Sequence, residues 1–254
     1  MKIVRLRSGR DDITYGGVEE EGIRLYRGTP FVAWEPTESL VTFEEAELLA
    51  PVLPTKIVAI GKNYADHAAE MDSVMPDEPL MFLKPATSVI GPHQPIVLPS
   101  QSTNVHHEVE LAAVVGKVAK NVSAENASDY LLGYTVANDV TARDLQAADG
   151  QWTRAKGFDT FCPLGPAIET EFDPGQGWTI SCSVNDGLRQ EGVLTDLHFG
   201  VGELLEHVTA VMTLLPGDVL LTGTPAGVGP IEAGDVVECS IEGIGTLRNP
   251  VGKR

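Results

Sequence analysis

Cysteine is scarce in this sequence, with only Cys162, Cys182 and Cys239 in 254 residues. The number is odd, the three are far apart, and no C-x-x-C spacing or neighbouring histidine cluster accompanies them. A disulfide framework and a zinc site are therefore not indicated. We expect reduced thiols in the core.

Long apolar runs are also missing. A membrane span needs roughly 18 consecutive apolar residues, and no run in the chain approaches that length. The opening stretch MKIVRLRSGRDDITYGG carries charges without an apolar segment behind them, unlike a secretory signal. We expect a cytoplasmic protein with no membrane partner.

Positive charge is in short supply, because 36 acidic residues face 18 basic ones and give a formal net charge of -18. Such a surface repels phosphate backbones, so nucleic acid is not expected as a partner. It also repels small carboxylates. An anionic substrate would therefore need local positive charge from a metal ion, lysine or arginine.

The chain is long enough to bury a full core, with 43% hydrophobic residues, and suits one large domain with a small appendage. Residues 1–53 are predicted to form a small N-terminal accessory domain of short strands, with turns at Gly16–Gly17, Gly22 and Gly28. Pro51 and Pro54 bracket a linker, because proline disfavours helix at the preceding residue and lacks an amide donor. The catalytic domain is predicted over residues 54–254.

Short apolar runs bounded by glycine and proline dominate beyond residue 56, which is typical of strands. Helical spacing is confined to four segments, namely residues 63–71, 124–132, 142–149 and 201–214. Regular strand–helix alternation is missing. The pattern favours an α+β fold with a rolled, mostly β core and few helices over a doubly wound sheet.

The sharpest chemical feature is the segment HHEVELAAVVG, which contains Glu108 and Glu110. Residues two apart in a strand share a face, so both carboxylates project together, on the face that continues into Ala112 and Val114. In a partly apolar interior they would repel each other unless a proton or a cation lay between them. The alternative is a strand end at which both glutamates are simply hydrated.

A third acid, Asp139, lies at the end of an apolar strand and before a predicted helix. Three oxygen ligands with room for water suit Mg²⁺, or Mn²⁺ as a substitute, better than zinc. The other interpretation is that Asp139 caps the following helix.

His67 and Glu70 are three residues apart in a predicted helix and face the same way. The carboxylate can then orient the imidazole and raise its basicity for proton abstraction. A surface ion pair is the alternative. The segment MDSVMPDEP that follows has two prolines and few apolar anchors. Residues 63–78 are therefore predicted to act as a lid, which without ligand is displaced, weakly ordered or the most mobile part of the main domain.

The candidate cations are Lys84, Arg143 and Lys156. Lys156 lies in an apolar, proline-stiffened run and could hold a buried ammonium opposite an enolate, although most lysines are solvated. Thr224 lies in the glycine-rich segment TGTPAGVGP, which precedes a strand and so does not match a dinucleotide fingerprint. Its hydroxyl and the nearby amides could hold a carboxylate, and a plain tight turn is the alternative.

Together these segments resemble the fumarylacetoacetate hydrolase family. The resemblance runs in order from about residue 56 to the C-terminus and rests on the segments GKNYADHAAEM, EPLMFLKPATSVIGP, HHEVELAAVVGK, GYTVANDVTARDLQ, AKGFDTFCPLGP, LLPGDVLLTGTPAGVGP and IEGIGTLRNPV. It implies the β-rich α+β fold of that family's C-terminal domain and a homodimer.

The resemblance also assigns roles to individual positions. It places a metal triad on Glu108, Glu110 and Asp139, and a catalytic dyad on His67 and Glu70. The remaining positions surround the substrate in family members: Arg143, Gln146, Lys156 and Thr224.

The family resemblance implies a small 2-oxo acid substrate, which chelates the metal while the metal stabilises the enolate. We expect first a Mg²⁺-dependent hydrolase or lyase that cleaves a C–C bond in a 3-acylpyruvate or oxaloacetate, since His106–His107 is similar to acylpyruvase and oxaloacetate decarboxylase members. The segment AKGFDTFCPLGP and the N-terminal appendage look instead like 2-hydroxyhepta-2,4-diene-1,7-dioate isomerases or decarboxylases of aromatic catabolism. A non-catalytic 2-oxo acid binding protein is the alternative from another class.

Overall fold

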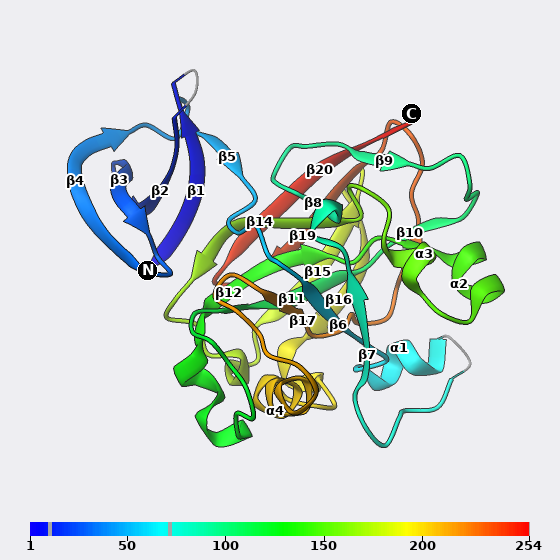
Figure 1. Cartoon of the computed structure of the whole chain (residues 1–254). Coiled ribbons are helices and arrows are strands. Elements are labelled where there is room, and N and C mark those ends of the chain that lie inside the picture. The colour runs from blue at the N-terminus through cyan, green and yellow to red at the C-terminus, as the bar shows by residue number, and fades with distance from the viewer. Residues whose placement is uncertain (10–11, 71–72, 254) are drawn as a thin grey trace.

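The computed structural model describes residues 1–9, 12–70 and 73–253 (Figure 1). Strands make up most of the regular structure and helices are few, which confirms the predicted α+β class with a mostly β core. Among the described residues no helix has both the length and the apolar character needed to cross a bilayer.

The largest sheet has 12 strands in the order β4-β3-β2-β1-β14-β12-β11-β17-β6-β7, with β5 beside β1 and β8 beside β14. Its strands are β1 (Lys2–Ser8), β2 (Asp12–Glu19), β3 (Gly22–Thr29), β4 (Ala33–Val41), β5 (Glu47–Leu49), β6 (Ile57–Gly61), β7 (Leu80–Lys84), β8 (Val89–Ile90), β11 (Val109–Val115), β12 (Leu131–Asn138), β14 (Cys162–Glu169) and β17 (Val219–Leu221).

A second sheet has the order β16-β15-β19-β20-β9, and a third has the order β13-β10-β18. Their strands are β9 (Ile96–Leu98), β10 (Val105–His107), β13 (Thr141–Ala142), β15 (Thr179–Val184), β16 (Gly187–Val193), β18 (Gly229–Pro230), β19 (Val236–Ile241) and β20 (Gly245–Lys253). The helices are α1 (Ala65–Glu70), α2 (Arg143–Asp149), α3 (Thr153–Lys156) and α4 (Val201–Val211), with 3₁₀ turns at Ala86–Ser88, Ala124–Tyr130, Pro174–Gln176 and Leu194–Asp196.

The four predicted helical segments all contain helix, but with different bounds. The segment 124–132 is a 3₁₀ helix rather than an α-helix, and α4 ends at Val211, where its apolar spacing gives way to the extended Met212. The predicted end of the first helix, Met71, lies outside the described residues. All three cysteines are free and buried, as expected.

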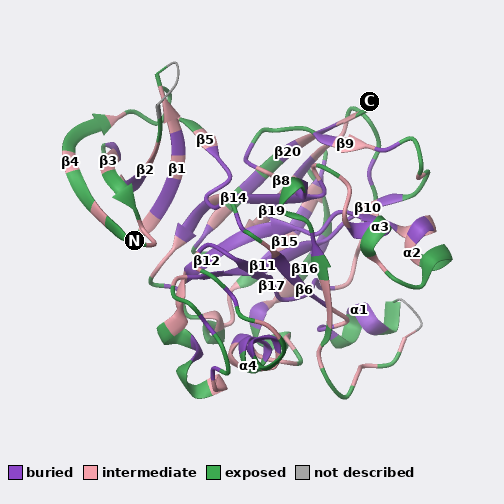
Figure 2. Ribbon diagram, in the orientation of Figure 1, coloured by how far each residue is buried: buried purple, intermediate pink, exposed green. Residues whose placement is uncertain are grey.

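Strand β11 explains how the two glutamates are placed. Val109, Leu111, Ala113 and Val115 pack into one apolar cluster, whereas Ala112 and Val114 pack into another on the opposite face. The period of two predicted from the sequence is therefore present. Both faces of β11 are covered, so the strand is buried along its whole length (Figure 2).

The N-terminal strands form a separate lobe in the view of Figure 1 but continue the main sheet. Strand β1 pairs antiparallel with β14 through Lys2–Glu169 and Ile3–Ile168. The turns predicted at Gly16–Gly17 and Gly28 are wrong, because these glycines lie inside β2 and β3. A Cβ on Gly16 would collide with the side chain of Ile23, so this glycine serves close packing rather than a turn.

Candidate active site

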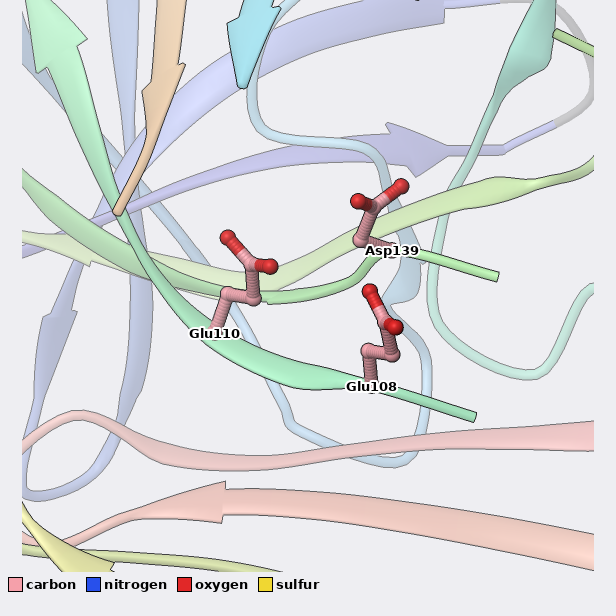
Figure 3. A group of neighbouring side chains, drawn as sticks. All are labelled: Glu108, Glu110 and Asp139. Atoms are coloured by element: carbon pink, nitrogen blue, oxygen red, sulfur yellow. The ribbon is translucent and has the colours of Figure 1, made fainter. Parts of the chain in front are cut away.

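Three buried carboxylates meet where β11 and β12 lie side by side. Glu108 directly precedes β11, Glu110 is its second residue, and Asp139 follows β12. The amide of Asp139 donates to Glu108 O at 2.8 Å, which fixes the two residues opposite each other. One ligand oxygen from each residue lies within 4.8 Å of the others, and Figure 3 shows the carboxylates turned towards a common space.

Burial decides between the interpretations of these acids. Glu108, Glu110 and Asp139 are at most 3% exposed, so the glutamates do not lie at a hydrated strand end. Helix α2 begins at Arg143 with Ala142 as its N-cap residue and without a side-chain cap, so Asp139 does not cap it. The arrangement is a buried acidic cluster.

Three cationic side chains surround this cluster. Lys156 Nζ donates to Glu108 Oε2 at 2.7 Å and to Asp139 Oδ2 at 2.6 Å. Arg143 pairs with Glu108 Oε1. Lys84 Nζ lies 2.6 Å from Asp139 Oδ1, a charge contact without hydrogen-bond geometry, and donates to the Lys156 carbonyl at 2.5 Å. Local positive charge is therefore present in this strongly acidic chain.

The surroundings shift the pKa values of these groups in different directions. Burial opposes ionisation of Glu108, but Arg143 and Lys156 outweigh it and hold its pKa well below the usual range. Burial, followed by Asp139 and Glu108, raises the pKa of Glu110 well above its ordinary value. Burial disfavours the charge of Lys156, but Asp139 and Glu108 prevail and raise its pKa.

Helix α1 places the predicted dyad beside the cluster. His67 Nδ1 lies 3.3 Å from Glu70 Oε2, and both oxygens of Glu70 accept a hydrogen bond from the Gly227 amide, at 3.1 and 3.2 Å. His67 is buried, which rules out a pair lying wholly on the surface. The glycine-rich loop therefore fixes the carboxylate that orients the imidazole.

A cavity of about 240 Å³ is lined by both the acidic cluster and His67 of the dyad. Eight of the residues singled out from the sequence line this cavity: His67, Glu108, Glu110, Asp139, Arg143, Gln146, Lys156 and Thr224. Glu70 contacts His67 without lining the cavity, and the candidate cation Lys84 is buried against Asp139 outside the lining. Within it Arg143 donates to Gln146 Oε1 at 2.9 Å. The structure thus brings all nine positions together from β6–α1, β11, β12, α2, α3 and the loop after β17.

Two aromatic residues that line the cavity were not predicted from the sequence. Phe82 and Trp152 both line it, with ring centroids 5.1 Å apart and an edge-to-face angle of 73°. A Cβ on Gly61 would lie 2.7 Å from the Trp152 ring, so that glycine makes room for the indole. In the sequence, the only sign of this contact is a glycine at the end of an apolar strand. Such a glycine indicates a close approach but does not identify Trp152 as the neighbour.

Fold and site together define an enzyme class in which a mostly β scaffold encloses an acidic cluster with cationic neighbours. Residues 56–252 match the family described as fumarylacetoacetate (FAA) hydrolase C-terminal, and residues 1–51 match the family Rv2993c-like, N-terminal. The chain belongs to the fumarylacetoacetate hydrolase family, whose members are enzymes.

Named relatives cover most of the chain. It is 54% identical to Protein Rv2993c of Mycobacterium tuberculosis over 83% of this chain and 80% of that protein. It is 44% identical to the mitochondrial oxaloacetate tautomerase fahd2 of Xenopus laevis, over 86% of this chain and 72% of that one. The structure of 5-carboxymethyl-2-hydroxymuconate delta-isomerase from Mycobacterium smegmatis superposes with a TM-score of 0.93 at 47% identity, covering 100% of both chains.

Proposed function

We propose that this protein is a Mg²⁺-dependent enzyme that acts on a small 2-oxo acid through its enolate, with keto–enol tautomerisation of oxaloacetate as its first candidate reaction. The observation that carries the proposal is the acidic cluster of Glu108, Glu110 and Asp139, which lines a cavity together with Lys156 and Arg143. The cavity of about 240 Å³ is smaller than the roughly 300 to 1,000 Å³ typical for larger ligands. A short substrate fits this size.

The residues present fit a hard divalent cation. Carboxylate oxygens are the protein ligands that Mg²⁺ prefers, with Mn²⁺ as a common substitute. Glu110 supports this fit, because the ion pairs among the described residues include none to it, and its oxygen Oε2 accepts only the Gly223 amide at 2.7 Å. A buried carboxylate in this position needs a proton or a cation. A bound Mg²⁺ would supply Lewis-acid charge beside the enolate oxygen.

The chain's own residues would then divide the remaining work. Arg143, Gln146 and Thr224 hold the carboxylate groups of the substrate. The Lys156 ammonium adds positive charge next to the developing enolate. His67, oriented by Glu70, would take the proton from C3 of the keto form while the oxygen on C2 gains a proton from solvent water. The reverse transfers would convert the enol form, so the substrate isomerises with no net gain or loss of atoms.

Tautomerisation takes first place over C–C cleavage because relatives with more than 40% identity are named oxaloacetate tautomerases. Cleavage of a 3-acylpyruvate or decarboxylation of oxaloacetate remains the second candidate. Between these two cleavage reactions, the His67–Glu70 pair favours hydrolysis, because an oriented imidazole can activate a water. Isomerisation of a longer dioate, as in the name of the M. smegmatis protein, is the third candidate.

We also propose that the enzyme is a homodimer.

A substrate panel tests the proposal. Enol-oxaloacetate, keto-oxaloacetate, acetylpyruvate and 2-hydroxyhepta-2,4-diene-1,7-dioate are each offered with Mg²⁺, with EDTA, and without protein. We expect Mg²⁺-dependent loss of enol absorbance with oxaloacetate and no pyruvate formation at a comparable rate. Pyruvate or acetate as the main product would transfer the assignment to decarboxylation or hydrolysis. Binding of oxalate without turnover of any substrate would favour the non-catalytic alternative.

A further inference from the structure

A buried glutamine outside the sequence-predicted site connects two parts of the cavity wall. Gln190 lies in β16, is 0% exposed, and uses its whole side-chain amide. Its Oε1 accepts from the Val109 amide at 3.1 Å and contacts His107 Nδ1 at 2.9 Å. Its Nε2 donates to Thr224 Oγ1 at 2.7 Å and to the Pro225 carbonyl at 2.8 Å.

Two main-chain groups fix which way this amide faces. A backbone N–H can only donate and a backbone carbonyl can only accept, so the Val109 amide requires the oxygen of Gln190 and the Pro225 carbonyl requires its nitrogen. The usual ambiguity between amide oxygen and nitrogen is therefore absent at this position. If the amide were flipped, its NH₂ group would face the Val109 N–H and its oxygen would face the Pro225 carbonyl. Neither pair can form a hydrogen bond, and no solvent reaches this buried position.

The orientation of Gln190 determines what the Thr224 hydroxyl can do. Because Nε2 of Gln190 has no lone pair to offer, Thr224 Oγ1 must be the acceptor in this contact. Its single proton then points elsewhere. Thr224 is 3% exposed, lines the cavity, and makes no other side-chain hydrogen bond among the described residues. The proton is left for a group inside the cavity.

We propose that Gln190 is a positioning residue that commits the Thr224 hydroxyl to donate a hydrogen bond to a carboxylate oxygen of the bound 2-oxo acid. This inference rests on the proposed function and adds one determinant of its selectivity for anions. Gln190 does not touch the substrate. It acts through Thr224, while its contact with the Val109 amide also holds the main chain between Glu108 and Glu110.

Oxalate binding to the Mn²⁺-loaded protein, measured by titration calorimetry, tests the hydroxyl. Thr224→Val removes the donor at nearly constant volume and should weaken oxalate binding about 10-fold to 100-fold, as expected for a hydrogen bond to a charged group. Thr224→Ser keeps the donor and should stay within about 3-fold of the wild type. Equal oxalate affinity of the Thr224→Val variant and the wild type would overturn the inference.

A double-mutant cycle tests the link to Gln190. In Gln190→Glu the carboxylate offers an acceptor to the threonine proton, so oxalate binding should fall by a factor similar to that of Thr224→Val. Combining both changes should cause no further loss, because the two residues act through the same hydrogen bond. Gln101→Glu makes the same chemical change at an exposed position and should have no effect. Additive losses would show that Gln190 does not act through Thr224.

Two further results keep the test decisive. If Gln190→Glu does not fold, a crystal structure of the wild type with Mn²⁺ and oxalate decides: Thr224 Oγ1 must lie within hydrogen-bond distance of both an oxalate oxygen and Gln190 Nε2. A structure lacking either contact overturns the inference. Failure of the wild type to bind Mn²⁺ or oxalate at all would instead refute the proposed function.

Discussion

At the scale of single residues, the site depends on how Lys156 is held. Its ammonium bridges Glu108 and Asp139, and its main-chain carbonyl accepts from Lys84, so both ends of the residue are fixed inside the core. The two carboxylates outweigh the cost of burial and raise its pKa. Lys156 is therefore a charged group at neutral pH, and its position beside the cavity suits a developing anion.

Replacing Lys156 tests this charge. Lys156→Met keeps most of the side-chain bulk and should lower kcat about 100-fold or more, because a preorganised charge acts mainly on the transition state. Steady-state kinetics on the preferred substrate give the result. Lys117→Met, at an exposed position, is the matched control and should leave kcat unchanged. A change in KM alone would show that Lys156 only binds substrate.

Removing one charge of the acidic cluster tests the cation. Glu110→Gln is nearly isosteric but offers a neutral ligand, so Mg²⁺ affinity should fall at least about 10-fold, consistent with the loss of one carboxylate ligand. Titration calorimetry with Mg²⁺ and activity after EDTA treatment measure this directly. Glu125→Gln, on the surface-lying 3₁₀ helix Ala124–Tyr130, is the control. Wild-type turnover in both the chelated enzyme and Glu110→Gln would exclude the metal mechanism.

Local spacing carried the signal for the acidic residues, whereas the family resemblance supplied the roles of Arg143, Gln146 and Thr224. Glu108 and Glu110 followed from the period of two in a strand, and Asp139 from its place at a strand end. Trp152 and Gln190 escaped because their function depends on partners more than 30 residues away, at Gly61, Thr224 and Val109. The burial of Lys84 against Asp139 was equally invisible, although Lys84 itself was recognised as a candidate cation.

At the scale of elements, Asp218 ties the residues just after the predicted linker to the catalytic sheet. This fully buried residue precedes β17 and accepts hydrogen bonds from the Thr55 amide and hydroxyl and from the Lys56 amide, between 2.7 and 3.0 Å. Lys56 Nζ adds an ion pair at 2.5 Å. These contacts fix the start of β6, the strand that leads into Gly61 and the dyad helix.

Asp218→Asn should lower the free energy of unfolding at pH 7 by about 2 to 4 kcal/mol, since it removes a charge that several donors share. Burial alone raises the pKa of Asp218, but Lys56 and the surrounding amides outweigh it and lower the pKa below 3.8. Its stabilisation is thus full above pH 3.8 and is lost as the pH falls through the folded-state pKa. Urea unfolding at pH 7 and pH 3 should show a smaller difference from wild type at pH 3. Exposed Asp129→Asn is the control.

Several contacts hold the residues that lead into the helix of the dyad. Asn63 is buried, and its side-chain amide donates to the carbonyls of Phe199 and Thr222 at 3.0 and 2.8 Å. Tyr64 forms a bridge with Leu197. Polar contacts before the helix and the burial of His67 place α1 beside the cavity. Movement of residues 63–70 on ligand binding stays a prediction. Of the remaining predicted lid, residues 71–72 lie outside the described residues, and closure of residues 73–78 stays a prediction.

His67→Ala separates the roles of the dyad and the metal ligands. His67 makes no part of the acidic cluster, so Mg²⁺ affinity should remain within about 3-fold of the wild type. Tautomerisation, and any hydrolysis of a 3-acylpyruvate, should fall at least about 100-fold, as expected for loss of a general base. Decarboxylation of oxaloacetate needs no base at this position and should suffer less. Equal loss of all three activities would contradict this assignment.

At the scale of the whole molecule, one sheet runs across the domain boundary predicted between residues 53 and 54. Beyond residue 56, glycine and proline punctuation indicated the strands, but the pairing of β1 with β14 joins residues more than 160 positions apart, which no local pattern encodes. Ile3 packs in the same apolar cluster as Ala112 and Leu164. The N-terminal residues therefore share a core with the strand that carries Glu110.

Because the N-terminal strands and the catalytic strands share an apolar core, we expect them to unfold cooperatively. A substitution at Ile3 tests this expectation. Ile3 is 1% exposed, so Ile3→Ala leaves a cavity and should cost about 2 to 5 kcal/mol. If residues 1–53 and 54–254 unfold together, calorimetry of this variant should show one transition moved as a whole to lower temperature. Ile13→Ala, at a residue in the same lobe that is 49% exposed, is the matched control and should move the midpoint by much less. A new low-temperature transition in Ile3→Ala, with Mn²⁺ binding retained above it, would instead establish that the N-terminal strands are an independent domain and that the catalytic part does not need them.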